Sequence, residues 1–558
     1  MITPQPGRTL LAQLAVRPSL SIEMLTLIVS LWFTVTSNPL FWSAVLDGHN
    51  KSATGLLTYA LALAVLLTAL HFALMAIALT RHTAKPILAA LIIATAFSAY
   101  YMSKYHVYLD PGMLRNVLNT DYREASELIS WGMLLVAAYA LPPLLLVYRA
   151  RLPHHTIRRA IGIRARSLLV AALLAFASGF FVFQDMSSLL REKHALRFLI
   201  TPGNFIYSTA RVLAVDSGDH ATTKTSVGSD AVLGPSWPQR KKPVLMVVVI
   251  GETARAANWG LSGYSRQTTP ELAALDVINF PDVTACGTST EVSLPCMLSA
   301  IGRRDYDEAR IRGSESLPHV LQHSGFKVSW LDNQSGCKGT CSGLDYWRPD
   351  VRSAPADCVD AYCFDEALLV GARKIVEGSQ ENHVLFLHTL GNHGPAYFKR
   401  YPARFRQFSP ACETTDLGHC AREEIVNAYD NAILYTDHVL AQTVAFLNSR
   451  QESHDTAMIY VSDHGESLGE NGIFLHGMPY AIAPDLQKKV PMVLWLSTGY
   501  AKSFDLDTGC LRQRALSPAT HTHLFHSVLG MLDVTTSAHD AQVDFVTGCR
   551  RPPREDGG

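Results

Sequence analysis

Long apolar stretches dominate the first third of the chain. Each is near the ~20 residues that an α-helix needs to cross the hydrocarbon core of a bilayer. The first is too long for a removable signal peptide and lacks a small-residue cleavage pattern. The pattern therefore predicts a transmembrane domain of five helices over residues 1–185. Its apolar stretches cover roughly 22–44, 55–79, 86–103, 128–148 and 167–184.

Charge in the short loops orients this domain. Basic residues gather between the second and third stretches, and again between the fourth and fifth, whereas loops 45–54 and 104–127 carry mixed charges. Cytoplasmic loops are enriched in Lys and Arg, so the N-terminus is predicted to be cytoplasmic. An odd number of spans then places the rest of the chain outside. The basic residues are Arg81, His82 and Lys85 in one loop and Arg149, Arg151, Arg158, Arg159, Arg164 and Arg166 in the other.

The pattern changes beyond residue 241. Short apolar runs at 244–250, 327–331, 384–389, 457–462 and 491–496 alternate with helical stretches. Such alternation predicts an α/β domain, 241–558, with a mainly parallel sheet sandwiched by helices. Between the domains, 187–214 mixes basic and apolar residues and predicts an amphipathic segment on the outer membrane surface, the alternative being a plain connector helix. The Ser-, Thr- and Gly-rich residues 215–240 predict an exposed linker.

The cysteines support an exported second domain. All ten lie at or after position 286. An even, clustered set is typical of disulfides in an oxidising compartment. Zinc ribbons and free thiols are the alternative, and the chain has no Cys-x-x-Cys. Spacing does not decide the connectivity. The nearest-neighbour interpretation pairs Cys286 with Cys296, Cys337 with Cys341, Cys358 with Cys363, Cys412 with Cys420, and leaves Cys510 and Cys549.

Polar residues follow two of the predicted strands. Glu252 comes directly after 244–250, and Asp463 and His464 come after 458–461. Open α/β sheets place their sites at strand ends. The loop between Cys286 and Cys296 holds several hydroxyl groups, which need a base or a metal to become nucleophiles. Carboxylate, imidazole and hydroxyl groups together form a ligand set suited to zinc. Spacing alone leaves Thr288, Ser289 and Thr290 equivalent.

Five motifs give the chain a family resemblance. They are Val-Ile-Gly-Glu252-Thr-Ala-Arg, Cys286-Gly-Thr-Ser-Thr290, Gly-Asn-His393-Gly-Pro, Ser-Asp463-His464-Gly-Glu466-Ser and Leu-His476-Gly-Met-Pro. Together they resemble the lipid A phosphoethanolamine transferases, including the mobile colistin-resistance enzymes, within the alkaline phosphatase and sulfatase superfamily. The resemblance selects Thr290 as the nucleophile. It implies one tight zinc ion held by Glu252, Thr290, Asp463 and His464.

The resemblance also implies a substrate site. Asn116, Thr120 and Glu124 are four apart and share a face if the outer loop 104–127 is helical, although a solvated loop helix would show the same spacing. Matching positions in the family line the lipid site. Where the family motif commonly has alanine, this chain has Glu291, whose charge is a candidate for tuning lipid choice. The further residues implied to bind substrate are Ser335, Lys338, His393, Glu466 and His476, with a second zinc expected at His393 and His476.

The expected reaction is a two-step transfer at the bacterial inner membrane, with the catalytic domain in the periplasm. Thr290 attacks phosphatidylethanolamine, and a lipid A phosphate then takes the phosphoethanolamine group, which implies polymyxin and colistin resistance. The alternatives are a lipopolysaccharide core sugar as the acceptor, a phosphatidylglycerol donor, a degenerate sensor or a transporter. No motif ligand is missing, and the spans lack charges typical of ion paths. We expect a monomer surrounded by membrane lipids. Zero net charge argues against nucleic-acid binding.

Overall fold

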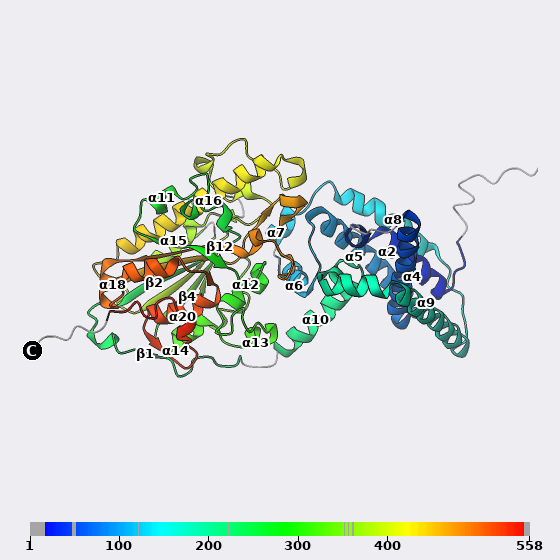
Figure 1. Ribbon diagram of the computed structural model, residues 1–558, viewed down its shortest axis with the longest axis horizontal. Helices are drawn as coiled ribbons and strands as arrows, with labels where there is room; N and C mark the ends of the chain where they lie inside the picture. Colours follow the sequence, from blue (N-terminus) through cyan, green and yellow to red (C-terminus); the bar gives the residue numbers. More distant parts are fainter. Residues whose placement is uncertain are drawn as a thin grey trace, which may run out of the picture. The chain divides into compact units, whose positions relative to one another are not determined.

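The computed structural model describes residues 17–46, 52–120, 122–192, 194–219, 224–350, 352–354, 357–359 and 362–551 (Figure 1). The chain forms two compact units. The first joins residues 1–110 to 131–209, and the second joins 111–130 to 210–558. The predicted outer loop therefore groups with the second unit, although it lies between two apolar stretches in the sequence.

All five predicted apolar stretches are helical. The first is two helices bent by 58° at Ser37 and Asn38. The Asn38 side chain donates to the carbonyl of Phe33 (2.8 Å) at this break. By length and composition, three of the described helices can cross a membrane, or four if the bent pair is one span. The bounds are α2 (Ile22–Thr36), α3 (Pro39–Leu46), α4 (Ala53–Ala78), α5 (Ala84–Tyr105), the shorter α8 (Met133–Arg149) and α9 (Ile157–Glu192).

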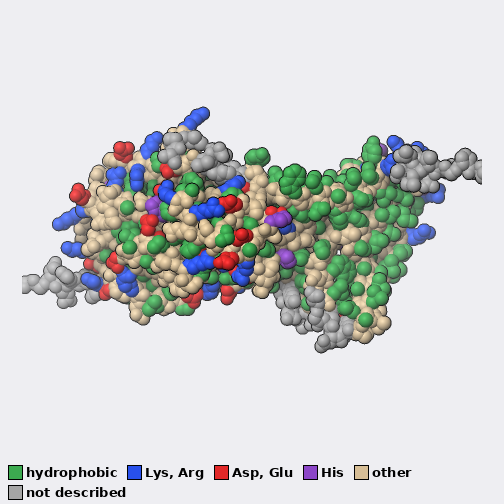
Figure 2. All heavy atoms as spheres, turned by 90° about the horizontal axis from the view of Figure 1, so that it is seen from above, with side chains coloured by type: hydrophobic (Ala, Val, Ile, Leu, Met, Phe, Trp, Pro, Cys, Tyr) green, Lys and Arg blue, Asp and Glu red, His purple; other side chains and the backbone are tan. Residues whose placement is uncertain are grey.

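The surface of the helical unit is apolar. Large side chains such as Ile77, Leu135 and Phe180 are 75%, 70% and 80% exposed. In Figure 2, hydrophobic side chains cover the visible face of this unit, while charged side chains gather on the other. Soluble proteins seldom expose contiguous apolar surfaces of this kind. Such a surface suits a hydrocarbon environment.

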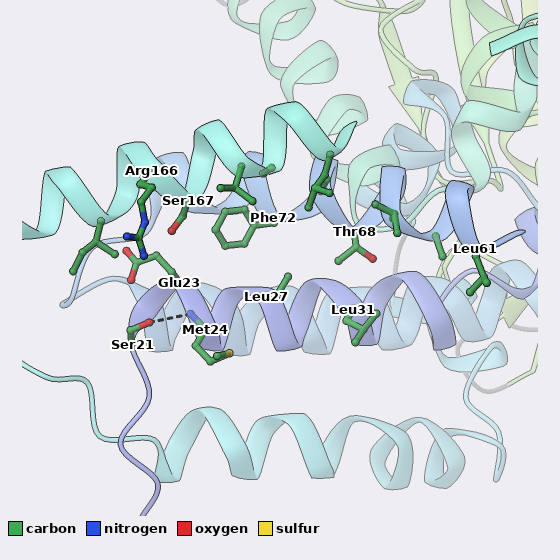
Figure 3. A pocket seen from close by; sticks show the side chains of 17 residues that line it. Ser21, Glu23, Met24, Leu27, Leu31, Leu61, Thr68, Phe72, Arg166 and Ser167 are labelled. Carbon is green, nitrogen blue, oxygen red and sulfur yellow. Dashed lines mark hydrogen bonds between the residues drawn. The ribbon is translucent and has the colours of Figure 1, made fainter. Parts of the chain in front are cut away.

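A groove of about 650 Å³ runs between α2, α4 and α9. Leu27, Leu31 and Leu61 are among its apolar lining residues. Ser21, Glu23 and Arg166 form its polar end (Figure 3). Arg164 pairs with Glu23 (3.1 Å), so the acid at this end has a cationic partner within the helical unit.

The second unit is built on an eight-stranded sheet with the order β13-β3-β12-β9-β2-β8-β4-β5. All neighbours are parallel except β12, which is antiparallel to both β3 and β9. The five predicted strands are all present, so the predicted α/β class is confirmed. The bounds are β2 (Val244–Gly251), β3 (Ile278–Thr284), β4 (Lys327–Asp332), β5 (Asp345–Trp347), β8 (His383–His388), β9 (Asp455–Ser462), β12 (Lys489–Leu496) and β13 (Ala519–Thr520).

Both faces of the sheet are covered. Val248 of β2 faces one buried apolar cluster and Val249 faces the other, because successive side chains of a strand point to opposite sides. This explains the continuous apolar runs in the central strands. The main covering helices are α12 (Thr290–Met297), α14 (Leu317–His323) and α20 (Thr522–Met531) on the first face, and α15 (Glu366–Ile375) and α16 (Arg422–Asn448) on the second.

The region between the predicted domains differs in part from expectation. The chain continues from α9 into a 3-10 turn, His194–Leu199, and α10 (Gly203–Asp219). Residues 224–240 are only partly an exposed linker. Ala231 is buried, β1 (Val232–Leu233) pairs with β14 (Val534–Thr535), and Trp237 packs on Phe326. The segment was predicted to be exposed because its composition is rich in Ser and Gly, and its few apolar residues form no run that would indicate packing.

The disulfides follow the nearest-neighbour interpretation. All four expected pairs are present, and the remaining two cysteines, Cys510 and Cys549, pair with each other. Two of these bridges enclose predicted site segments, the hydroxyl loop after Cys286 and the short loop around Lys338.

Candidate active site

Two carboxylates meet at one edge of the sheet. β2 and β9 are parallel neighbours, with Gly251 opposite Ser462. Glu252 and Asp463 follow these strand ends and are fully buried. Thr253 has φ 60, a left-handed conformation that is rare for a β-branched residue. This conformation lets the Thr253 N–H donate to Asp463 Oδ1 (3.1 Å), which ties the two strand ends together.

Thr290 stands at the first position of α12. Its Oγ1 donates to Glu252 Oε2 (3.0 Å) and lies 3.4 Å from His464 Nε2. The competing hydroxyl of Thr288 instead donates to the carbonyl of Met478 (2.6 Å). The structure thus distinguishes hydroxyl groups that spacing left equivalent, and it places Thr290 against both predicted ligand loops.

The ligand atoms of Glu252, Asp463 and His464 lie within 4.8 Å of one another. His464 Nδ1 donates to the carbonyl of Gly465 (2.9 Å), so Nε2 is the ring nitrogen that faces the carboxylates. Asp463 Oδ1 accepts from the N–H groups of Thr253 and His464. Among the described residues, the buried Oδ2 has no hydrogen-bond partner, and it lies 3.5 Å from His464 Nε2. An orphan carboxylate oxygen beside an imidazole and a hydroxyl fits a zinc ion.

Electrostatics in this group favour a cation. Burial raises the pKa of Asp463 to about 6, and the nearby Glu252 charge adds to this rise. Burial also opposes ionisation of Glu252, but the hydrogen bond and charge of His464 outweigh it and hold the Glu252 pKa well below its usual value. For His464, burial is outweighed by the Asp463 and Glu252 charges, which raise its pKa to about 10. The negative potential is therefore strong.

A second possible metal group adjoins the first. It consists of His464, Glu466 and His476. Glu466 accepts from His476 Nδ1 (2.8 Å) and from the hydroxyl of Tyr397 (2.6 Å). The ring of His393 stands 5.7 Å from that of His476. Among the described residues, the possible metal group that includes His476 therefore also contains Glu466 and His464, and the predicted His393 lies beside it.

Lys338 lies in the small loop closed by the Cys337–Cys341 disulfide, and Ser335 precedes that loop. Lys338 Nζ donates to the hydroxyl (2.8 Å) and the carbonyl (3.1 Å) of Ser335. Only 4% of the Lys338 side chain is exposed, and its Nζ lies 3.8 Å from Glu291 Oε2. Lys338 is therefore no ordinary surface lysine, and Glu291 faces the predicted substrate groups.

The predicted lipid-binding face belongs to α6 (Pro111–Asn119), which packs against α12. Asn116 is half-buried, and the hydroxyl of Thr120 donates to the Asn116 carbonyl (2.7 Å). The side chain of Glu124, in α7 (Tyr122–Glu127), lies outside the described residues. Gly477, with φ 86, allows α6 to approach the His476 loop, because a Cβ there would lie 2.3 Å from Met113.

Ion pairs that the sequence did not reveal hold this segment in place. Arg115 of α6 pairs with Glu308, and Glu127 of α7 pairs with Arg400. Arg115 is 3% exposed. The partners are more than 190 positions apart, so spacing could not suggest them. Tyr397 was also missed, although it follows the Gly-Asn-His393-Gly-Pro motif closely.

His521 links the hydroxyl loop that begins at Cys286 to the end of strand β9. Its Nδ1 accepts from the N–H of Cys286 (3.0 Å), and its Nε2 donates to the carbonyl of Ser462 (2.9 Å). Ser293 adds a hydrogen bond from its hydroxyl to the Asp463 carbonyl. The hydroxyl loop and the Asp463 loop are therefore held together by residues that no motif singled out.

The sheet domain and its site define an enzyme of the sulfatase fold class, joined to a helical membrane unit. The sulfatase family profile matches residues 245–534, and the profile for phosphoethanolamine transferase EptA/EptB matches residues 45–216. Phosphoethanolamine transferase EptA of Escherichia coli K12 is 34% identical over 97% of this chain and its own full length. Phosphatidylethanolamine transferase Mcr-1 of Escherichia coli is 34% identical over 95% of this chain and 98% of its own.

A solved structure agrees with these matches. The integral membrane lipooligosaccharide phosphoethanolamine transferase A of Neisseria meningitidis superposes with a TM-score of 0.89 and 34% identity, over 96% of this chain and all of that one. The chain therefore belongs to the EptA phosphoethanolamine transferase family. It is an enzyme and an integral membrane protein.

Proposed function

We propose that this enzyme transfers phosphoethanolamine from phosphatidylethanolamine to a lipid A phosphate, through a covalent adduct on Thr290. The observation that carries the proposal is the position of Thr290. Its hydroxyl, at the N-terminus of α12, contacts the ligand group of Glu252 and His464. Family membership supports phosphoethanolamine as the transferred group.

Glu252, Asp463 and His464, with Thr290, would hold one zinc ion. When bound, such an ion lowers the pKa of a ligated hydroxyl and polarises a phosphoryl oxygen. The second group, His464, Glu466 and His476, would hold a further cation or contact the substrate. The negative potential of these buried carboxylates supports both assignments.

In the first step, the Thr290 oxygen forms a bond to the donor phosphorus and the bond to the diacylglycerol oxygen breaks. The proton of Thr290 ends on the departing diacylglycerol. In the second step, a phosphate oxygen of lipid A forms a bond to the same phosphorus and the bond between phosphorus and the Thr290 oxygen breaks. Thr290 takes up the proton that the lipid A phosphate monoanion gives up. In-line transfer of this kind depends mainly on positioning and charge neutralisation.

Several side chains would perform that positioning. Lys338 would contact the donor phosphate, and the first N–H groups of α12 would face its oxygens, because helix N-termini favour anions. His476 is suited to moving protons. Burial, and then the charge of His464, lowers its pKa, so its ring is neutral at neutral pH. Asn116 and Thr120 would contact the donor head group from α6.

The test uses the purified full-length protein in detergent. Incubation with phosphatidylethanolamine should add one phosphoethanolamine group to the peptide that contains Thr290, seen by mass spectrometry. Lipid A from cells that express the protein should gain the same group and the cells should resist colistin. Transfer to a core sugar instead of lipid A would keep the chemistry and change the acceptor. An unmodified Thr290 would refute the proposal.

A further inference from the structure

Glu291 is a buried carboxylate that the proposed mechanism leaves without a role. It follows Thr290 in the first turn of α12 and is 1% exposed. Arg312 donates to Glu291 Oε1 (2.8 Å) and to the Glu291 backbone carbonyl (2.6 Å). The second carboxylate oxygen, Oε2, is buried without a hydrogen-bond partner among the described residues. An ionised oxygen in this state is costly unless something binds it.

Lys338 faces that oxygen. The 3.8 Å between Lys338 Nζ and Glu291 Oε2 exceeds hydrogen-bond distance. An ammonium has three donors, and Ser335 takes two of them. Lys338 also has φ 49, a left-handed conformation that is unfavourable for a lysine. Lys338 on the short loop and Glu291 on α12 therefore lie close to each other without forming a hydrogen-bonded ion pair.

We infer that Glu291 and Lys338 together bind the zwitterionic head group of the donor, with the ammonium at Glu291 Oε2 and the phosphate at Lys338. This inference rests on the proposed function and adds a determinant of donor choice. A phosphoethanolamine group carries one anion and one cation a few bonds apart. When the head group binds, the 3.8 Å pair of Lys338 and Glu291 is replaced by two close pairs, ammonium with Glu291 and phosphate with Lys338. The net charge of the pocket stays unchanged.

The same geometry disfavours an anionic donor. A phosphoglycerol head group could take Lys338, but it offers no cation to Glu291. The carboxylate would then stay buried beside a second negative charge, and a buried charge that loses its partner is strongly destabilising. Glu291 thus selects by charge between two abundant classes of phospholipid, those with a zwitterionic and those with an anionic head group.

Glu308 provides the matched control, because it contacts the same arginine, Arg312, as Glu291 does. Arg312 donates to Glu291 on one side and lies 3.3 Å from Glu308 Oε1 on the other. Glu308 also pairs with Arg115, and its side chain is 26% exposed. A Glu308→Gln substitution therefore disturbs the same arginine without removing the carboxylate that faces Lys338. A purely structural role for Glu291 predicts similar behaviour from the two variants.

The experiment measures the rate of adduct formation on Thr290 in full-length protein in detergent, with phosphatidylethanolamine or phosphatidylglycerol as the donor. We expect Glu291→Gln to lower the preference for phosphatidylethanolamine by about tenfold or more, the effect of one lost charge-assisted contact. Glu308→Gln should leave the preference unchanged. A Glu291→Gln protein that slows both donors equally would overturn the inference.

A second measurement needs no variant. Soluble phosphoethanolamine should inhibit adduct formation by the parent protein at lower concentration than glycerol phosphate does, because only the former carries an ammonium. Equal inhibition would also overturn the inference. A parent protein that forms no adduct with phosphatidylethanolamine would refute the proposed function itself, so the two failures are distinct.

Discussion

Thr290 Oγ1 donates a hydrogen bond to Glu252 Oε2 across 3.0 Å, although the residues are 38 positions apart. Glu252 directly follows the central strand β2, and Thr290 begins α12, so a strand end of the sheet and a covering helix each contribute one partner. The bond fixes the direction of the Thr290 hydroxyl, whereas the hydroxyl of Thr288 donates to the carbonyl of Met478. This relationship makes Thr290 the side chain whose loss should affect transfer most.

Thr290→Ala should reduce transfer by on the order of a thousandfold or more, since Thr290 is the residue of the described chain whose hydroxyl contacts both Glu252 and His464. The fold should survive, because one lost hydrogen bond costs about 1 kcal/mol. Thr290→Ser should retain part of the activity. Modified lipid A, measured at matched membrane levels, reports the result.

The control is Thr288→Ala, which removes a hydroxyl two positions away that bonds to Met478. It should lower stability slightly and keep transfer. If Thr288→Ala abolished transfer while Thr290→Ala did not, the nucleophile would be the other threonine.

Zinc content should depend on Asp463 and His464 together. The double variant Asp463→Ala, His464→Ala removes two of the three charged or imidazole ligands, so the purified protein should hold little zinc by elemental analysis. Asp437→Asn is the matched control, because Asp437 is equally buried but binds the backbone N–H groups of Glu271 and Leu272. Stoichiometric zinc in the double variant would exclude this ligand set.

The sequence predicted the central sheet well, because strands covered on both faces require continuous apolar runs. β3 was missed for the opposite reason. Its buried residues alternate with exposed or half-buried ones, and Pro281 interrupts the run. The antiparallel direction of β12 also left no trace in the pattern. Strand direction depends on how the connections run, and an apolar run has the same composition either way.

Of the predicted ligand residues, Glu252, Asp463 and His464 could be proposed from the sequence because they follow the ends of strands, whereas Thr290 was selected by the family resemblance. Glu291 was singled out only because it departs from the family motif, and Arg312 and Arg115 were not found. Their roles depend on ion pairs between segments that the fold alone brings together. The grouping of residues 111–130 with the second unit has the same origin, since Arg115 and Glu127 find their partners there.

Acid should destabilise the protein through His521. Burial lowers the pKa of His521 to about 3 from 6.5, so the folded state keeps it neutral while the unfolded state protonates it below about pH 6.5. Stability is therefore lost as pH falls through this window, by about 1.4 kcal/mol per pH unit for one group. His521→Gln should show a shallower loss between pH 6 and pH 4, followed by fluorescence-detected unfolding in detergent.

The comparison with the parent removes acid effects that both proteins share, including loss of metal. His419 is a suitable control because its side chain is 78% exposed. His419→Gln should retain the slope of the parent. An unchanged slope in His521→Gln would mean that other groups control the acid response.

The disulfides should separate stability from activity. The Cys510–Cys549 bridge spans 39 positions and Cys337–Cys341 spans 4. Loop-entropy estimates give about 4 kcal/mol for the long loop and about 2 kcal/mol for the short one. When both cysteines of a pair are replaced by serine, the variant without Cys510–Cys549 should therefore have the lower melting temperature. Transfer should fall more in the short-loop variant, because that loop holds Lys338. Equal transfer by both would remove the loop from the substrate site.

Asn116 tests whether α6 delivers the donor lipid. It is half-buried on a helix that packs against α12, whereas Asn119 on the same helix is exposed. Asn116→Ala should weaken use of phosphatidylethanolamine by about tenfold, as expected for one hydrogen bond to a charged head group. Zinc content should stay at the level of the parent, because Asn116 belongs to neither possible metal group.

Asn119→Ala changes the same residue type on the same helix and should titrate like the parent. The assay follows adduct formation on Thr290 against phosphatidylethanolamine concentration in detergent. If the two alanine variants behave alike, α6 is a packed connector, and the donor head group must be held by the sheet unit around Lys338.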